Sequence, residues 1–351
     1  MENHRDTPHH HVARQDAAYD VVVVGGGTAG LSAALVLGRS RRSVLVVDAG
    51  EPRNAPAAHM QGYLSRDGMP PADFLAEGRR ELGRYGVGLV NDRVLAVTPD
   101  GAGEFGVTLA GGGTVHARRV IVATGLVDEL PAVPGLAERW GRDVLHCPYC
   151  HGWEVRDQPF GVLAAEPFNS HQALLVTQWS KDVTLFLHTV RDLPDAEWER
   201  LAAAGVRVVE GEVAGLAVED DRLTGVRLAG GRVFPRSVLF VPAKPVPRDD
   251  LLGALGAEPR DTPFGPYPAV DETGRTSLPG VWAVGNAASP MEQVINAAST
   301  GYRAGSAVNA ELVMTDIEAA AARRRAGAFT PRTEAAVARA VAGEHAHGLN
   351  V

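Results

Sequence analysis

The stretch DVVVVGGGTAGL at residues 20–31 decides the fold. Residues 20–24 form a β-branched apolar run that predicts a buried strand, the glycines predict a tight turn, and residues 31–38 predict a helix. A second buried strand is expected over residues 43–47, ending at Asp48. Strand, glycine turn, helix, strand and acid in this order are typical of the first half of a dinucleotide-binding fold.

The spaced glycines of this turn each have a physical role. Gly25 permits the sharp bend, Gly27 lets a pyrophosphate approach the backbone, and Gly30 lets helix and strand pack closely. The helix N-terminus offers free N–H groups to the phosphates, and Asp48 would accept hydrogen bonds from the adenosine ribose. A glycine-rich turn without a ligand is the alternative. The predicted dinucleotide-binding residues are Gly25, Gly27, Thr28, Ala29, Gly30 and Asp48.

Two later segments favour FAD over NAD as the dinucleotide. The buried run at residues 120–125 ends in a glycine turn, and the run at residues 280–286 is a strand that leads into another. FAD is long and extended, so distant segments must hold its ribityl chain and isoalloxazine ring. A helix expected from about Gln293 would point its N-terminus at the flavin. Either segment alone could be an ordinary strand end. The further FAD-binding residues predicted are Ala123, Thr124, Gly125, Gly285, Asn286, Gln293 and Val294.

Proline-rich connections at residues 130–135 and 242–247 flank a central segment that has its own strands. A central domain over residues 131–247 is therefore expected to be inserted into an FAD domain made of residues 18–130 and 248–325. Within these domains we expect a β-meander over residues 89–99, 104–110 and 114–118, strands over residues 160–164, 183–188, 206–209 and 238–241, and a helix over residues 197–204.

The composition excludes several classes of protein. The formal net charge of −8 argues against a nucleic-acid or anionic-membrane partner. No apolar run has the length of a signal peptide or a membrane span, so the expected compartment is the cytosol. Residues 1–17 predict a disordered leader in which His9 to His11 could bind metal but are typical of a tag-like segment, and no metal site is predicted. Residues 326–351 predict a helical extension with a break near residues 327–331.

The run HCPYCH at residues 146–151 holds the two cysteines of the chain. Two cysteines at this spacing can close a small disulfide ring, and their thiol pKa values are often depressed. In this interpretation Cys147 exchanges thiols with the substrate, Cys150 gives a thiolate to the flavin, and His146 acts as base or acid. Zinc is the competing interpretation. A structural zinc site usually needs four ligands and no second CxxC is present, although His146 and His151 could in principle complete a set. An inert buried cysteine pair and an ordinary histidine also stay open.

A pyridine-nucleotide reductase needs a second phosphate cradle after the first strand of its inserted domain. Here that strand, at residues 160–164, is followed by AEPFNS at residues 165–170, without glycines. Glu166 would put a carboxylate where a pyrophosphate should lie, and Pro167 removes a backbone donor. No arginine pair for a 2′-phosphate follows the next strand. We therefore expect this domain to keep its fold without binding NADPH, so that electrons arrive from a dithiol and leave to a small acceptor such as O2.

Taken in order over residues 18–320, these motifs resemble the thioredoxin reductase-like superfamily. The resemblance implies an α/β fold of two Rossmann-like, three-layer ββα domains, with the CxxC domain inserted into a discontinuous FAD domain. A typical reductase has an aspartate where Asn286 stands, although an asparagine can still hydrogen-bond a ribityl hydroxyl. The lost cradle argues against NADPH-driven reduction of thioredoxin.

Two runs, DAGEPRN at residues 48–54 and HCPYCHG at residues 146–152, are similar to the FAD-dependent dithiol oxidases that close disulfides in natural products of the gliotoxin, holomycin and romidepsin kind. That resemblance implies a homodimer, O2 as acceptor, hydrogen peroxide as product, and an Asn–His pair that assists the thiols. Asn54 and His146 are the matching positions, although from the residues alone Asn54 is more typical of a turn. The resemblance also points to a bacterial dithiolopyrrolone such as holomycin as the product.

Three hypotheses follow from these patterns. The preferred one is a dithiol oxidase in which a small-molecule dithiol reduces the Cys147–Cys150 disulfide and O2 finally takes the electrons. The second is a disulfide reductase of similar fold that is fed by NADPH or another donor. The third is a flavin-bound redox sensor, for which only the Ala-rich segment after Thr315 could serve.

Overall fold

The computed structural model describes residues 17–101, 103–166, 169–328 and 331–342. The chain divides into two compact units, residues 1–305 and residues 306–351. The predicted leader, with His9 to His11, lies outside the described residues except for Ala17.

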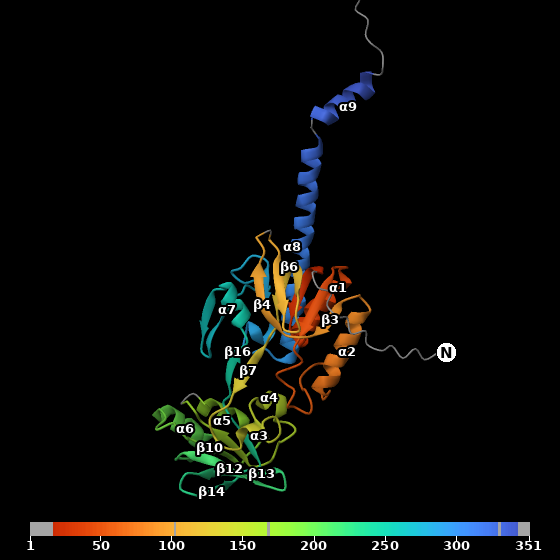
Figure 1. The fold of residues 1–351 in the computed structure, drawn as a ribbon. Helices are drawn as coiled ribbons and strands as arrows, with labels where there is room; N and C mark the ends of the chain where they lie inside the picture. Colours follow the sequence, from red (N-terminus) through yellow and green to blue (C-terminus); the bar gives the residue numbers. More distant parts are fainter. Residues whose placement is uncertain (1–16, 102, 167–168, 329–330, 343–351) are drawn as a thin grey trace, which may run out of the picture. The chain divides into compact units, whose positions relative to one another are not determined.

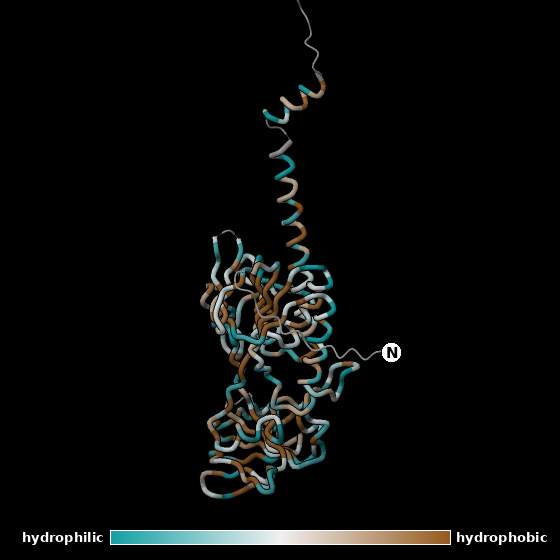
Figure 2. The backbone as a smooth tube through the Cα atoms, turned by 45° about the vertical axis from the view of Figure 1, so that its right-hand side comes forward, coloured by the Kyte–Doolittle hydropathy of each residue, from teal (hydrophilic) through white to brown (hydrophobic). Residues whose placement is uncertain are grey.

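The first unit contains a seven-stranded sheet in the order β3-β2-β1-β6-β5-β4, with β19 paired to β6. β1, β2, β3, β6 and β19 are parallel, whereas β4 and β5 form an antiparallel meander with β6. The valines of β1 are all buried, as is usual in a parallel sheet covered on both faces, and Figure 2 shows these central strands in brown as hydrophobic. The strands are β1 (Ala18–Val24), β2 (Val44–Asp48), β3 (Gly88–Asn91), β4 (Val94–Pro99), β5 (Phe105–Leu109), β6 (Thr114–Val122) and β19 (Val281–Ala283).

The predicted meander is correct only in part. Residues 89–99 do not form one strand, because the chain turns at Asp92, whose carboxylate accepts the N–H groups of Arg93 and Gly111. β3 therefore pairs with β2, and only β4 joins the meander. The two runs predicted on either side of Arg119 are one continuous strand, β6.

The helix after the glycine turn, α1 (Thr28–Arg39), begins at Thr28 and not at Leu31. It begins earlier because the Leu31 N–H already bonds the Gly27 carbonyl at 2.9 Å, which makes Gly27 the N-cap. α1 packs against α2 (Pro71–Gly83), and the two lie side by side in Figure 1.

A second, five-stranded sheet is wholly parallel, with the order β11-β10-β9-β15-β8. Four of its strands coincide with predicted runs, and α6 begins two positions before the predicted helix, at Asp195. β8, α5 and an antiparallel sheet of β12, β13 and β14 are not predicted from the sequence. The elements, drawn in green in Figure 1, are β8 (Val144–Leu145), β9 (Phe160–Leu163), α5 (Ser170–Val176), β10 (Val183–Phe186), α6 (Asp195–Ala203), β11 (Arg207–Val209), β12 (Val213–Glu219), β13 (Arg222–Leu228), β14 (Val233–Pro235) and β15 (Val238–Phe240).

The two connections between these sheets pair with each other. β7 (Leu126–Glu129) and β16 (Lys244–Pro247) are antiparallel, so the proline-rich segment predicted as a linker over residues 242–247 is partly a strand. Prolines are tolerated there because a two-stranded ribbon leaves one side of each strand unpaired. The chain then returns to the first sheet at β19. One mixed and one wholly parallel sheet, each with helices and joined by the β7–β16 ribbon, confirm the predicted α/β class.

The long helix α8 (Val294–Ala328) begins where a helix from about Gln293 is predicted. α9 (Pro331–Ala342) follows in the second unit, so the predicted extension is helical in its described residues. Of the helices in the described ranges, none is both long and apolar enough to cross a membrane. The remaining elements are α3 (Leu136–Arg139), α4 (Pro148–His151), α7 (Asp250–Leu255), β17 (Pro259–Thr262), β18 (Gly265–Pro268) and η2 (Gly285–Ala287).

Candidate functional site

A cavity of about 1820 Å³ in the first unit brings most of the predicted site residues together. Its wall includes the glycine turn after β1, the ends of β2 and β6, the dithiol segment and the residues before α8. Gly30 and Gly285 are not part of this wall; a Cβ on either would collide with neighbouring atoms of the turn. The predicted residues that line the cavity are Gly25, Gly27, Thr28, Ala29, Asp48, Asn54, Ala123, Thr124, Gly125, His146, Cys147, Cys150, Asn286, Gln293 and Val294.

The glycine turn has the shape that a pyrophosphate needs. Gly25 has a φ of +106°, and a Cβ there would lie 2.3 Å from the Ala123 carbonyl oxygen. A Cβ on Gly30 would lie 1.9 Å from the Gly25 carbonyl oxygen, so both positions require glycine. By contrast, nothing lies within 4 Å of a Cβ position on Gly27. The space beside Gly27, next to helix N–H groups that lack an intrahelical partner, fits the diphosphate of FAD.

Asp48 stands at the end of β2 and is fixed by two donors. Its Oδ1 accepts the Gly26 N–H at 3.0 Å, and its Oδ2 accepts Arg79 Nη2 at 2.7 Å. The carboxylate therefore orients the glycine turn, and each oxygen still has a lone pair for a ribose hydroxyl. The predicted ribose contact stays a prediction.

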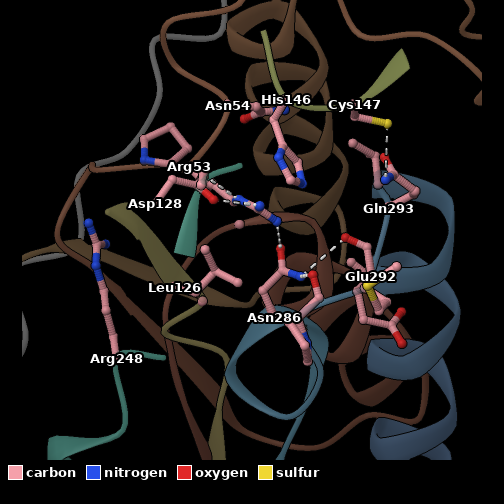
Figure 3. Close-up of a pocket in the computed structure, with 18 of the residues that line it drawn as sticks. Arg53, Asn54, Leu126, Asp128, His146, Cys147, Arg248, Asn286, Glu292 and Gln293 are labelled. Carbon is pink, nitrogen blue, oxygen red and sulfur yellow. Dashed lines mark hydrogen bonds and ion pairs between the residues drawn. The ribbon is translucent and has the colours of Figure 1, made fainter. Parts of the chain in front are cut away.

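The dithiol lies at the start of α4, with Cys147 as its N-cap and Cys150 inside it. Both cysteines are reduced and half-buried. Cys150 Sγ donates to Gln293 Oε1 at 3.2 Å, and Gln293 Nε2 donates to Cys147 Sγ at 3.8 Å. Figure 3 shows the Gln293 side chain directed at the Cys147 sulfur. The cysteines of the inserted segment thus contact the residue that precedes α8.

The two thiols differ strongly in acidity. The pKa of Cys147 is lowered from 9.0 to about 7, first by a hydrogen bond from the Cys150 thiol and then by backbone N–H groups, against the opposing effect of burial. The pKa of Cys150 is raised by the same hydrogen bond, by burial and by the neighbouring charge. In the reduced pair the charge therefore resides on Cys147. Cys150 can act as the predicted thiolate only after it releases its proton.

His146 points into the cavity beside Asn54 (Figure 3). Its Nδ1 lies 3.2 Å from the Val241 carbonyl oxygen, and because a carbonyl can only accept, Nδ1 carries the hydrogen of the neutral ring. Nε2 is then the basic nitrogen. Gln172 Nε2 donates to the His146 carbonyl at 2.6 Å and fixes its backbone. In the part of the chain described, no hydrogen bond joins the Asn54 and His146 side chains, so their cooperation stays a prediction.

Sequence reasoning missed the central ion pair of the cavity. Arg53 binds Asp128 through two hydrogen bonds of 2.8 Å, and its Nη1 donates to Asn286 Oδ1 at 3.2 Å. The Asn286 amide also donates to backbone carbonyls of the next turn, including that of Ser289 at 3.0 Å. Asn286 thus fixes Arg53 and that turn, and only one lone pair is left for the predicted ribityl contact. No local signal links Arg53 to Asp128, which β7 supplies from a distant part of the chain.

The turn after β9 is closed by a side chain. Asn169 Oδ1 accepts the N–H groups of Ala165 at 2.9 Å and Glu166 at 2.7 Å, and Asn169 is only 6% exposed. These are backbone donors that a second pyrophosphate would need. The closed turn supports the predicted loss of the cradle, which stays a prediction. Pro167, predicted to remove a further donor, lies outside the described residues.

The zinc interpretation of the CxxC finds no further ligands. Among the residues that the structure describes, no group of three or more His, Cys, Asp or Glu side chains is arranged to hold a metal ion. The two sulfurs instead contact each other and Gln293.

The family described as pyridine nucleotide-disulphide oxidoreductase matches residues 19–301. The chain is 34% identical over 317 residues to the thioredoxin reductase sirT of Leptosphaeria maculans, covering 86% of this chain and 96% of that one. Among solved structures, HlmI is 50% identical with a TM-score of 0.85, covering 89% of this chain and 98% of that one. An oxidoreductase from Agrobacterium tumefaciens is 38% identical with a TM-score of 0.80, covering 85% and 99%. These likenesses confirm the predicted thioredoxin reductase-like fold.

Proposed function

The chain belongs to the pyridine nucleotide-disulphide oxidoreductase family, and from this premise we propose that it is an FAD-dependent dithiol oxidase that closes a disulfide within a small-molecule dithiol. It is an oxidoreductase with FAD as its cofactor, like the thioredoxin reductases that share its fold. In the proposed reaction O2 is the final acceptor and hydrogen peroxide the second product.

The single observation that carries the proposal is the closed turn after β9. Asn169 occupies the Ala165 and Glu166 N–H groups, and the exposed Glu166 carboxylate would repel a pyrophosphate. The first turn, at Gly27, is open to a dinucleotide. The cavity thus has one dinucleotide cradle and a dithiol. This arrangement favours a dithiol substrate, and not NADPH, as the source of electrons.

In the proposed cycle a substrate thiolate attacks the Cys147 sulfur of the Cys147–Cys150 disulfide. A mixed disulfide forms at Cys147, and the Cys150 sulfur leaves and takes a proton. The second substrate thiol then attacks the substrate sulfur of the mixed disulfide, which releases the product disulfide and the Cys147 thiolate. Cys147 is a good leaving group because its thiol pKa is lowered to about 7. His146 Nε2 is the base that takes the proton of the incoming thiol.

FAD, when bound, supplies the two-electron acceptor that restores the Cys147–Cys150 disulfide and passes the electrons to O2. The Arg53 guanidinium lowers the pKa of Cys147 through its charge and so stabilises the thiolate that the cycle produces. The residues proposed to hold FAD are Gly25, Gly27, Thr28, Ala29, Gly30, Asp48, Ala123, Thr124, Gly125, Gly285, Asn286, Gln293 and Val294.

The finer features of the proposal come from the resemblance to natural-product dithiol oxidases. They are a homodimer, assistance of the thiols by Asn54 together with His146, and a dithiolopyrrolone of the holomycin kind as product. A cytoplasmic location, expected from the sequence itself, is proposed as well. The Asn54 side chain lines the same cavity as His146, which supports a shared role.

Oxygen consumption tests the proposed function. The FAD-loaded protein is mixed in air with a panel of small dithiols, without NADPH, while O2 uptake and hydrogen peroxide are measured. We expect O2 uptake with at least one dithiol and an equal amount of hydrogen peroxide. The Cys147→Ser variant should show no uptake. No uptake with any member of the panel would count against an oxidase.

The second candidate function is a thioredoxin-type disulfide reductase driven by NADPH or another donor. It is favoured by the similarity to sirT, which is named a thioredoxin reductase. Reduction of a protein disulfide at the expense of NADPH would support it.

A further inference from the structure

Gln293 bridges the two sulfurs from the opposite side of the cavity. It immediately precedes α8, whereas both cysteines belong to the segment around α4. Its carboxamide has one end on each sulfur, with Oε1 at 3.2 Å from Cys150 Sγ and Nε2 at 3.8 Å from Cys147 Sγ. A single side chain therefore contacts both members of the working dithiol.

The two ends of a carboxamide have opposite hydrogen-bonding capacity. The oxygen only accepts, so its partner sulfur must carry a hydrogen; the amide nitrogen only donates, so its partner sulfur must offer a lone pair. In the observed orientation the hydrogen is on Cys150 and the lone pair is on Cys147. The reverse assignment would leave the oxygen facing a thiolate and give the amide N–H only the weaker acceptor of a neutral thiol.

We propose that Gln293 is a positioning residue that holds the single proton of the reduced dithiol on Cys150 and leaves the negative charge on Cys147. The proposal rests on the proposed function only in taking these two cysteines as the working pair. The contact from Cys150 exists only in the reduced state, because a disulfide has no S–H to donate, and the contact to Cys147 is stronger there because its sulfur carries the charge. Gln293 thereby favours Cys147 as the thiolate that leaves when the product disulfide is released.

Among the other polar groups around the sulfurs, the Arg53 charge does not distinguish one sulfur from the other, whereas two backbone N–H groups do. Arg53 lowers the pKa of both cysteines through its charge. The remaining titratable side chains that line the cavity near the dithiol are those of His146, Tyr149, His151 and Glu292. The backbone N–H groups of Tyr149 and Cys150 also favour charge on Cys147, so removal of the Gln293 carboxamide should weaken the preference without abolishing it.

Site-resolved alkylation tests the proposal. The FAD-loaded protein is fully reduced under argon, freed of reductant, and pulse-labelled with iodoacetamide at a series of pH values, and the label on Cys147 and Cys150 is located by tandem mass spectrometry. In the wild type we expect Cys147 to label first, with a midpoint near its pKa of about 7. Gln293→Leu should raise that midpoint by about one pH unit and reduce the excess of label on Cys147 about tenfold.

Gln293→Glu separates the donor from the acceptor at the same side-chain length. The carboxylate can still accept from Cys150 but has no N–H for Cys147, so the Cys147 midpoint should rise at least as far as in Gln293→Leu. Gln178→Leu, an exposed glutamine in the turn after α5, is the matched control and should leave the midpoint unchanged.

Three results would overturn the proposal: first labelling of Cys150 in the wild type, a Cys147 midpoint in both Gln293 variants equal to that of the wild type, or an equal shift in Gln178→Leu. The labelling needs no substrate, O2 or NADPH. A failed oxidase assay with a shifted midpoint would refute the proposed function alone, and an unshifted midpoint with normal oxygen uptake would refute the role of Gln293 alone.

Discussion

Two turns of the first unit follow the same plan with opposite results. The turn after β1 and the turn after β9 each follow a parallel strand whose last four residues are buried, and each leads to a helix. In the first, Gly27 leaves open space beside the helix N-terminus. In the second, the Asn169 carboxamide takes the N–H groups of Ala165 and Glu166. The strands keep the same architecture, whereas the turn residues decide whether a dinucleotide can bind.

The comparison teaches that fold and electron source are separable. A Rossmann-like unit can keep its core while the residues of one turn, here the Asn169 carboxamide and the Glu166 carboxylate, disfavour a bound phosphate. With one turn open and one closed, we propose that electrons enter through Cys147 and Cys150. Substitutions in the two turns and in the dithiol test this contrast, and their expected effects range from complete loss of FAD to a small change in stability.

A side chain added at the tightest position of the turn after β1 should abolish FAD binding. Gly30→Ala puts a Cβ 1.9 Å from a backbone carbonyl oxygen, so we expect a loss of about 3 kcal/mol or more in unfolding free energy and no bound FAD. Gly27→Ala is the matched variant, because its Cβ meets nothing within 4 Å. It should unfold in urea within about 0.5 kcal/mol of the wild-type apoprotein yet bind FAD more weakly. Equal stability of the two variants would contradict this account of the turn.

If the dithiol is the sole route for electrons, its removal should leave almost no turnover. Cys147→Ser should lower the rate of dithiol-dependent O2 uptake at least about 1000-fold, because serine cannot form the exchangeable disulfide. The FAD content measured by absorbance should stay near that of the wild type. A variant that retains a tenth of the activity would show that electrons bypass the sulfurs.

The pH dependence sharpens the contrast between sulfur and nicotinamide as electron source. Because the pKa of Cys147 is lowered to about 7, chiefly by the Cys150 thiol, its thiolate predominates above that pH and is protonated below it. At saturating dithiol, kcat should therefore fall about tenfold per pH unit below pH 7. Arg53→Met should move this acid limb to higher pH, because it removes a charge that favours the thiolate. If the acid side of the pH profile has the same midpoint in the wild type and in Arg53→Met, the group that titrates there is not Cys147.

The smallest effect is expected in the second turn. Asn169→Ala leaves two N–H groups without their acceptor and should cost about 1–2 kcal/mol in urea unfolding, whereas Asn169→Asp keeps the acceptor and most of the stability. Neither variant should gain reduction by NADPH, because the Glu166 carboxylate remains. Reduction of Asn169→Ala by NADPH would show that this side chain alone closes the turn.

The sequence allowed the elements with local causes to be predicted. The glycine spacing after β1, the buried strands at residues 160–164 and 183–188, and the start of α8 all follow from patterns within a few residues. The split of residues 89–99 was missed because it depends on Asp92 binding the distant Gly111 N–H.

The contacts that complete the site could not be predicted from the same patterns. Arg53 meets Asp128 75 positions away, and Gln293 meets Cys150 143 positions away. Such pairs form only because the connections between the two large sheets bring distant segments together, and the local sequence pattern does not predict this. Asn169 lies within the quoted run AEPFNS, yet its side chain is visible as a cap only once the turn is folded.

Rapid mixing under strict exclusion of oxygen tests the central claim most directly. The oxidised, FAD-loaded protein is mixed in one syringe pair with a small dithiol and in another with NADPH, and the flavin absorbance is followed. Bleaching by the dithiol, with an unchanged spectrum over minutes in NADPH, is the result that the closed second turn predicts. Bleaching by NADPH as fast as by the dithiol would mean that a pyridine nucleotide docks and delivers its electrons, and the account would be wrong.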